Sequence, residues 1–478
     1  MRSFKAGQPL LYGLAMLFLI VVAGGLAEAK TLNVANNGVD SLTCGDKKSP
    51  CRSISIAIDN ANPGDKIVVG PGHYGDLDED TDFNDAGEEK AEGQSGCDCM
   101  IKVNKQLTIE SRDGAGATVL DARGANIDVV RIQVSGVIFG KKKKGFTLTH
   151  GAEGLFINNG TNGVRVESNL AITNSFDGFN FFGSGHVLNG NTASGNGSSG
   201  FGFSGSGHLL SNNIASANDS SGFEFSGSGH VLSGNIARAN VSTGFGIIGS
   251  GHLLTGNLAS GNDSDGFAFF GGNGNVLSGN TAVDNTNDGF AFNGTGHLLT
   301  DNSAVGNQAK GISVVGSGSS ATITKNNIFG NHGSCGPGDN IGLRNGSGGA
   351  INATNNFWGA ATGPGADPAD DICNAGAGSS TTVAPFATKE FKVKVKALDE
   401  IPREVAPVVS STFAPVLESN YELKLYTLTG QLIASISNST QLASASHSLA
   451  NGMYLAVKVY ADGRRELHRL MILRGVGA

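Results

Sequence analysis

The feature that most constrains the fold is an internal repeat of about 22 residues. Glycines that precede an aromatic or aliphatic residue follow one another at intervals of 22, 22, 22, 22, 23 and 22, at Gly178, Gly200, Gly222, Gly244, Gly266, Gly289 and Gly311. Asparagines keep the same interval in two series, at Asn191, Asn213, Asn235, Asn257, Asn280 and Asn302, and at Asn196, Asn218, Asn240, Asn262, Asn285 and Asn307. Such a period is typical of solenoid proteins, in which neighbouring repeats stack.

One unit, residues 178–199, predicts the shape of a single coil. Phe179 and Phe181 alternate with Asn180, which is typical of a strand, and Gly183–Gly185 then predicts a turn. Two further short strands, 186–188 and 192–194, are each followed by a turn rich in glycine and asparagine. Three strands and three turns form one triangular coil, so the sequence predicts an all-β parallel β-helix.

Stacking of the coils explains why the same residue types recur. Successive coils lie about 4.8 Å apart, so equivalent phenylalanines form internal columns and asparagine amides bond from coil to coil. One column is Phe179, Phe201, Phe223, Phe245, Phe267 and Phe290, and another is Phe181, Phe203, Phe225, Ile247, Phe269 and Phe292. This apolar content argues against disorder despite 73 glycines. The motifs of leucine-rich repeats and of calcium-binding nonapeptide rolls do not occur.

The N-terminus predicts export. Arg2 and Lys5 precede an apolar run, Leu10–Ala23, and Ala27-Glu28-Ala29 is a small-x-small cleavage site. We therefore expect a signal peptide at residues 1–29, a mature chain from Lys30, and no later membrane span. The formal charge is −8, and removal of two basic and one acidic residue makes it −9, which argues against a nucleic-acid partner.

Several segments resemble a known group of proteins. The stretch PCRSISIAIDNANPGDKIVVGPGHY, which predicts a helix at residues 51–62 followed by a strand at 66–69, resembles the start of bacterial secreted β-helix proteins of the pectin lyase-like superfamily. The 22-residue units resemble the parallel-β-helix repeat family, and Asn355-Asn356-Phe357-Trp358-Gly359 resembles a closing coil. The resemblance implies a right-handed parallel β-helix with an N-terminal helix cap over residues 30–386.

The C-terminal part has a different composition. Residues 387–415 are charged and contain prolines, as in a linker or an outgoing strand. Residues 416–478 alternate apolar and polar residues, with a hairpin turn at Asp462-Gly463. This region is similar to small β-sandwich domains that sort or attach exported bacterial proteins, which implies a secreted or cell-surface protein, with the periplasm as the alternative location.

Six cysteines in an exported chain predict disulfides. Cys44–Cys51 and Cys335–Cys373 are plausible local pairs. Cys97 and Cys99 either pair with each other or bridge to the first pair.

Three groups of residues are candidate sites. The histidine series His186, His208, His230, His252 and His297 either holds a metal or is a repeated turn residue, and Asn275 replacing one member favours the second interpretation.

Asp265 and Asp288 occupy the same coil position with Lys310 next in line, which would suit a lyase or hydrolase, although aspartate before glycine is also a common turn residue. Asp78, Asp80, Asp82 and Glu89 fall at positions 1, 3, 5 and 12 of an EF-hand-like loop, so they are candidate Ca²⁺ ligands, with Phe83 where glycine is usual.

The motifs of polygalacturonases, pectate lyases and alginate epimerases do not occur in the chain, and the clearest coils are nearly identical. Catalysis normally needs a distinctive coil or loop. The leading hypothesis is therefore a non-catalytic protein that binds a polysaccharide or a cell-surface glycan. The alternatives are a polysaccharide lyase or hydrolase acting on acidic glycans, and a metal-handling periplasmic β-helix protein.

Overall fold

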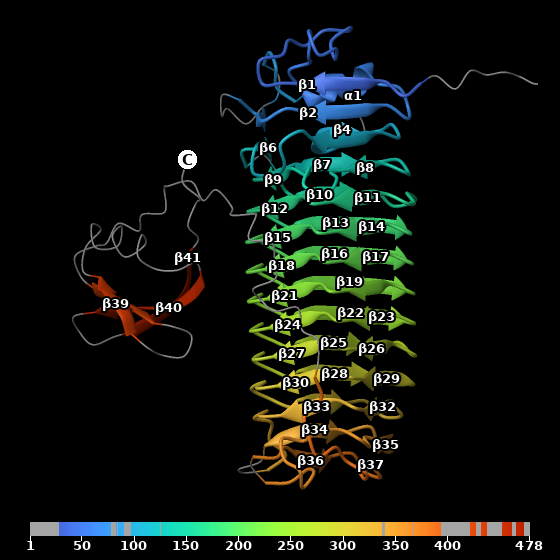
Figure 1. The fold of residues 1–478 in the computed structure, drawn as a ribbon, viewed down its shortest axis with the longest axis vertical. Coiled ribbons are helices and arrows are strands. Elements are labelled where there is room, and N and C mark those ends of the chain that lie inside the picture. The colour runs from blue at the N-terminus through green and yellow to red at the C-terminus, as the bar shows by residue number, and fades with distance from the viewer. Residues whose placement is uncertain are drawn as a thin grey trace, which may run out of the picture.

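The computed structural model describes residues 28–77, 83, 85–89, 97–124, 126–336, 340–366 and 368–392, together with four strands nearer the C-terminus. The predicted signal peptide lies outside this range, apart from its last two residues. Residues 31–382 form three long parallel sheets that share one core, so the predicted parallel β-helix is confirmed (Figure 1).

Each sheet takes one strand from nearly every coil. The fourteen-stranded sheet contains, in spatial order, β1 (Thr31–Val34), β2 (Lys66–Val69), β5 (Thr108–Ser111), β8 (Ile138–Phe139), β11 (Arg165–Glu167), β14 (Val187–Asn189), β17 (Leu209–Ser211), β20 (Val231–Ser233), β23 (Leu253–Thr255), β26 (Val276–Ser278), β29 (His297–Thr300), β32 (Ala321–Thr324), β35 (Ala350–Asn352) and β37 (Ser380–Thr382). The twelve-stranded sheet contains β4 (Cys99–Val103), β7 (Asp128–Ile132), β10 (Leu155–Ile157), β13 (Phe179–Ser184), β16 (Phe201–Ser206), β19 (Phe223–Ser228), β22 (Phe245–Ser250), β25 (Phe267–Phe270), β28 (Phe290–Asn293), β31 (Ile312–Val314), β34 (Ile341–Asn345) and β36 (Asp371–Asn374). The eleven-stranded sheet contains β3 (Gly72–Gly75), β6 (Thr118–Asp121), β9 (Thr147–Thr149), β12 (Leu170–Ile172), β15 (Thr192–Ser194), β18 (Ile214–Ser216), β21 (Ile236–Arg238), β24 (Leu258–Ser260), β27 (Thr281–Val283), β30 (Ser303–Val305) and β33 (Asn327–Phe329).

The predicted phenylalanine columns fill the core. Phe179, Phe201 and Phe223 are fully buried, and their rings stack with centroids 4.9 and 4.7 Å apart. The predicted turn at Gly183–Gly185 starts later than expected, because β13 continues to Ser184. A Cβ at Gly205, in the equivalent position of the next coil, would lie 1.9 Å from the carbonyl oxygen of Gly183. Only glycine therefore lets the two backbones pair at this point.

Both asparagine series form the predicted ladders. Asn191 donates from Nδ2 to Oδ1 of Asn213 at 3.0 Å and to the carbonyl of Val166 at 2.9 Å, while its backbone N–H also reaches Oδ1 of Asn213. The same pattern continues from coil to coil, with each amide fully buried. The ladders satisfy polar groups that would otherwise be buried without partners.

The first coil is covered by α1 (Ile54–Asn60), which buries Ile54, Ala57 and Ile58 (Figure 1). The predicted helix is confirmed, but it is shorter at both ends than the predicted range 51–62. Ser53 caps its N-terminus by accepting the N–H of Ile56. Three disulfides join Cys44 to Cys51, Cys97 to Cys99, and Cys335 to Cys373. The two predicted local pairs are confirmed, and Cys97 pairs with Cys99 rather than with the first pair.

Nearer the C-terminus the structure describes β38 (Tyr421–Tyr426), β39 (Leu432–Ile436), β40 (Gly452–Tyr460) and β41 (Arg465–Ile472), which form one antiparallel sheet. The sandwich arrangement stays a prediction, and the predicted turn at Asp462-Gly463 lies outside the described residues. In the part of the chain that the structure describes, no helix has both the length and the apolar character needed to span a membrane.

Candidate functional site

The histidine column is buried inside the β-helix. Nδ1 of His208 accepts the backbone N–H of His186 at 3.2 Å, and Nε2 of His208 donates to the carbonyl of Ser204 at 3.3 Å. His186 and His230 repeat this pattern, so both ring nitrogens of all three residues are engaged with the backbone. Burial lowers the pKa of His208 to about 3 and that of His252 to about 4.

Asn275 occupies the same position and accepts the N–H of His252 through Oδ1 at 2.8 Å. The amide oxygen thus replaces an imidazole nitrogen as an acceptor of the backbone N–H. This geometry favours the interpretation of the histidines as repeated structural residues over their role as metal ligands.

Asp265, Asp288 and Lys310 lie on consecutive coils, as the repeat predicts. Oδ1 of Asp265 accepts the N–H of Asp288, and Oδ1 of Asp288 accepts the N–H of Lys310, both at 2.9 Å. Burial, with repulsion from Asp288, raises the pKa of Asp265 to about 6. Each carboxylate thus caps the turn of the following coil, which is a structural role for the pair.

Of the four candidate Ca²⁺ ligands, Asp78, Asp80 and Asp82 lie outside the described residues. Glu89 is buried at the start of α1, where its two carboxylate oxygens accept the N–H groups of Ile54 and Ser55 at 2.7 Å and the hydroxyl of Ser55 at 2.6 Å. Burial raises its pKa to about 7. The structure therefore makes Glu89 a helix cap instead of a free ligand at position 12 of a calcium loop.

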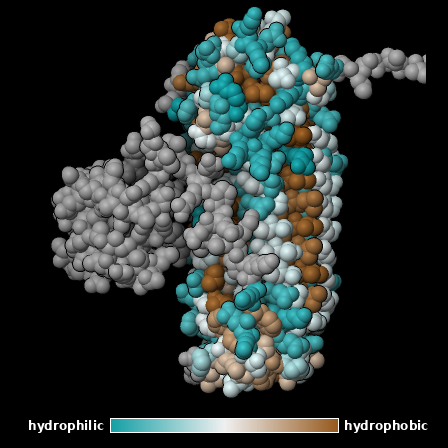
Figure 2. Space-filling view, in the orientation of Figure 1, coloured by the Kyte–Doolittle hydropathy of each residue, from teal (hydrophilic) through white to brown (hydrophobic). Residues whose placement is uncertain are grey.

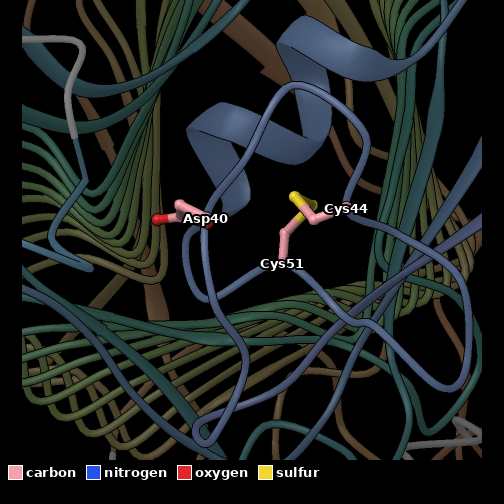
Figure 3. A group of neighbouring side chains, drawn as sticks. All are labelled: Asp40, Cys44 and Cys51. Atoms are coloured by element: carbon pink, nitrogen blue, oxygen red, sulfur yellow. A yellow bond between two sulfur atoms is a disulfide. The ribbon is translucent and has the colours of Figure 1, made fainter.

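Within the described residues, Asp40, Cys44 and Cys51 form a group of three potential metal ligands (Figure 3). The two sulfur atoms form a disulfide, so neither is a thiolate. Oδ1 of Asp40 accepts the backbone N–H groups of Arg52 and Ser53 at 2.8 and 3.0 Å. This group stabilises the N-terminal cap.

A different set of polar residues departs from the repeat, on the outward face of the twelve-stranded sheet. The first outward position of successive strands is occupied by Arg131, Phe156, Asn180, Gly202, Glu224, Gly246, Ala268, Ala291, Ser313 and Arg344. Glu224 is the one charged residue between the two arginines, and glycine stands on either side of it. A charged residue in the middle of Phe223-Glu224-Phe225, where the neighbouring coils have glycine, is the sequence signal that could have identified Glu224.

Glu224 belongs to a carboxylate cluster made of Asp128, Glu153, Asp177 and Glu224. The first three precede β7, β10 and β13 or start them, at the same coil position as Asp265 and Asp288. Oε2 of Glu153 accepts a hydrogen bond from the N–H of Asp177 at 2.8 Å, and Oε1 accepts one from the Nδ2 amide group of Asn180 at 3.1 Å. Burial, followed by repulsion from Asp177, raises the pKa of Glu153 to about 8.

Ser199 connects the last two members of the cluster. Its N–H donates to Oδ1 of Asp177 at 2.8 Å, and its hydroxyl donates to Oε2 of Glu224 at 3.2 Å. Gly202 gives these carboxylates room, because a Cβ there would lie 2.3 Å from Oδ2 of Asp177. Burial, with repulsion from Glu224, raises the pKa of Asp177.

Aromatic residues flank the cluster on the same face. The guanidinium of Arg131 pairs with Asp128 at 2.8 Å and lies over the ring of Phe156, 4.4 Å from its centroid. Phe156 contacts Phe182, with centroids 5.6 Å apart. On the other side of Glu224, Phe270 is 63% exposed and its ring lies beside Gly246. The cluster and these rings form the strongest candidate for a binding surface.

The model of the family described as "Right handed beta helix region" matches residues 115–263 and 242–357, which together are slightly more than half of the chain. A search of curated proteins gives no significant match. Similar solved structures include the pectate lyase Pel9A, with 17% identity, coverage of 76% of this chain and 80% of that chain, and a TM-score of 0.38. The A-module of the mannuronan C-5 epimerase AlgE6 of Azotobacter vinelandii has 15% identity, coverage of 71% and 95%, and a TM-score of 0.41. The catalytic unit of a GH87 α-1,3-glucanase of Streptomyces thermodiastaticus has 14% identity, coverage of 81% and 72%, and a TM-score of 0.38. On the family match and the observed fold, the chain belongs to the right-handed β-helix region family.

Proposed function

We propose that this protein binds a polysaccharide along the outward face of the twelve-stranded sheet, centred on Glu224. The observation that carries the proposal is the interruption of a repetitive face by Glu224, between small residues and linked through Ser199 to Asp177. A regular scaffold that changes its side chains at one place, on an accessible face, is a common arrangement for a binding site.

The exposed rings support a glycan as the partner. Phe182 and Phe270 lie four strands apart in the sheet, which corresponds to about 19 Å at the usual strand separation. Between them the face carries glycine and serine together with Glu224 and Ile248, which is 49% exposed. Aromatic faces favour C–H edges such as those of sugar rings, and the carboxylates offer acceptors for hydroxyl groups.

The charges of the cluster favour a glycan without acidic groups. Arg131 is already paired with Asp128, and neither Asp177 nor Glu224 forms an ion pair with another residue that the structure describes. A polyuronate would bring further carboxylates next to them, and like charges in a partly dry site repel. Acidic glycans would bind here only with a cation such as Ca²⁺. Export and surface attachment, predicted from the two ends of the sequence, would place the protein where such polymers occur.

Hydrolysis of the bound glycan is a second candidate, favoured by Glu153. A pKa of about 8 keeps its carboxyl group protonated at neutral pH, as a general acid requires, and Asp177 lies beside it. Both oxygens of Glu153 also accept hydrogen bonds from the protein, which fits a purely structural role. Binding is therefore the primary proposal.

A panel of neutral, amino-sugar and acidic polysaccharides, with and without Ca²⁺, tests the proposal by affinity electrophoresis and by assay of chain ends released. Binding should weaken about tenfold or more in Glu224→Gln and Phe270→Ala, because each removes a central contact. Two matched controls are Asp301→Asn, an exposed acid elsewhere, and Leu253→Ala, an exposed apolar residue of the fourteen-stranded sheet. Loss of binding in the controls, or none in the site variants, would contradict the assignment. Release of chain ends that stops in Glu153→Gln would establish hydrolysis.

A further inference from the structure

The outward side chains of two sheets of this β-helix differ in their exposure, and their sequences do not explain the difference. In the fourteen-stranded sheet, outward Leu209, Leu253 and Leu298 are 46%, 40% and 36% exposed. They belong to a line of aliphatic residues that follows the coils, visible as brown atoms over this sheet in Figure 2. This is the exposure expected of an uncovered sheet face.

From β21 onward, the corresponding column of the eleven-stranded sheet is buried. Ile236 and Leu258 alternate with the inward Ala237 and Ala259, so their side chains point away from the core. They are nevertheless only 4% and 6% exposed, and Thr281 and Ser303 in the same column are 7% exposed. An outward column with so little exposure is covered from outside.

The described chain approaches this column at its C-terminal end. The N–H of Ala387 donates to the carbonyl of Asn356 at 2.9 Å, and four residues later Phe391 bonds with Asn327. Both polar groups of the Asn327 amide take part: Oδ1 accepts the N–H of Phe391 at 2.9 Å, and Nδ2 donates to its carbonyl at 2.8 Å. Asn327 starts β33, the strand next to β30, so the chain is heading back along the column toward the N-terminal coils.

We propose that the segment beginning at Val393 docks on this column and covers Leu258 and Ile236. The sequence Phe391-Lys-Val-Lys-Val-Lys396 alternates strictly, so an extended chain would place its valines on the sheet and its lysines in solvent. From β33 to β21 is four strands, about 19 Å, which about six extended residues can cover. Residues 393–420 separate Lys392 from β38, so length is sufficient.

Docking of this segment does not depend on the glycan site, and it gives residues 387–415 a structural role. Instead of a free linker, the docked segment fixes where the C-terminal region leaves the β-helix. It also buries an apolar column that would otherwise be an exposed sheet surface prone to association.

Thiol labelling of the full chain tests the docking directly, because all six cysteines are in disulfides and a new cysteine is the only free thiol. Leu258→Cys should react with iodoacetamide roughly 100-fold more slowly than Leu253→Cys, since each of two docked valines contributes about one factor of ten. Adding Val393→Asp and Val395→Asp to Leu258→Cys should raise its labelling rate to that of Leu253→Cys. Lys394→Asp, on the solvent side of the segment, should leave the protection of Leu258→Cys unchanged. Ile236→Cys gives a second reporter if Leu258→Cys does not fold.

Three results would overturn the proposal. Equal labelling of Leu258→Cys and Leu253→Cys in the parent chain would mean that the column is open. Slow labelling that persists with both valines replaced would mean that another element covers it. Protection that grows with protein concentration would identify a second copy of the chain as the cover.

Discussion

The backbone N–H of Ser199 donates a 2.8 Å hydrogen bond to Oδ1 of Asp177, and the hydroxyl of the same serine reaches Glu224. Repulsion from Glu224 adds to the burial that raises the pKa of Asp177. Replacement of Glu224 by glutamine removes that repulsion and keeps the shape of the side chain. We therefore expect Glu224→Gln to lower the pKa of Asp177, measured from its carboxyl carbon shift by NMR. An unchanged pKa of Asp177 would show that the two carboxylates do not interact electrostatically. Asp301→Asn serves as the control.

The phenylalanine columns should dominate stability. Phe223 is fully buried between Phe201 and Phe245, at centroid distances of 4.7 and 4.8 Å. Phe223→Ala should cost about 3–5 kcal/mol of unfolding free energy, because no neighbouring coil can fill the cavity. Phe270→Ala, at an exposed position, should stay within about 0.5 kcal/mol of the parent. Chemical denaturation of both variants gives the comparison, and equal effects would contradict the predicted burial difference.

The buried histidines should make the protein sensitive to acid. His208 has an ordinary pKa near 6.5 when unfolded and about 3 in the fold, so the unfolded chain binds a proton that the folded chain does not. Its contribution to stability is complete above pH 6.5 and is lost as the pH falls toward 3, at about 1.4 kcal/mol per pH unit.

His208→Asn should reduce this acid sensitivity, because Asn275 shows that an amide can accept the coil-to-coil N–H. Lost contacts with Phe181 and Phe203 should make the variant less stable at pH 7.5. The measured quantity is therefore the slope of unfolding free energy against pH between 6.5 and 4. Parallel slopes for parent and variant would show that His208 does not titrate on unfolding.

The asparagine ladder should tolerate few substitutions. Asn235 accepts two hydrogen bonds from Asn213 and donates to Leu210 and Asn257. Asn235→Ala leaves several buried polar groups without partners and should cost about 3 kcal/mol or more. Ser233→Ala, outward on the adjacent strand and exposed, is the matched control and should be nearly neutral. A mild effect of Asn235→Ala in the same denaturation assay would mean that the amides find other partners.

Most of the fold followed from the period of the sequence. A coil cannot bury Phe179 or Asn191 alone, so a strict repeat leaves stacking as the remaining solution. β13 extends further than the sequence predicts. Glycine and serine usually signal turns, whereas here Gly183 is needed for close backbone pairing. Cys97–Cys99 pairing and the capping role of Glu89 depend on irregular N-terminal coils, where no repeat indicates which groups meet.

The candidate site was harder to predict from sequence. Asp265 and Asp288 were identified because they share a coil position, and the structure shows that this position caps the next turn. Asp177 shares that position too, as its place directly before Gly178 indicates. Asp128 and Glu153 also share it, but irregular coil lengths before Gly178 conceal their register. Glu224 was visible as a break between Gly202 and Gly246, yet its contact with Ser199 requires the stacked coils.

Hydroxyl-radical footprinting with a bound glycan, identified by the polysaccharide panel, tests the central claim most directly. Saturating glycan should protect Phe182 and Phe270 from oxidation and leave Leu209 and Leu253 unchanged. Protection of the two leucines with no change at the phenylalanines would place the glycan on the fourteen-stranded sheet and contradict the assigned site.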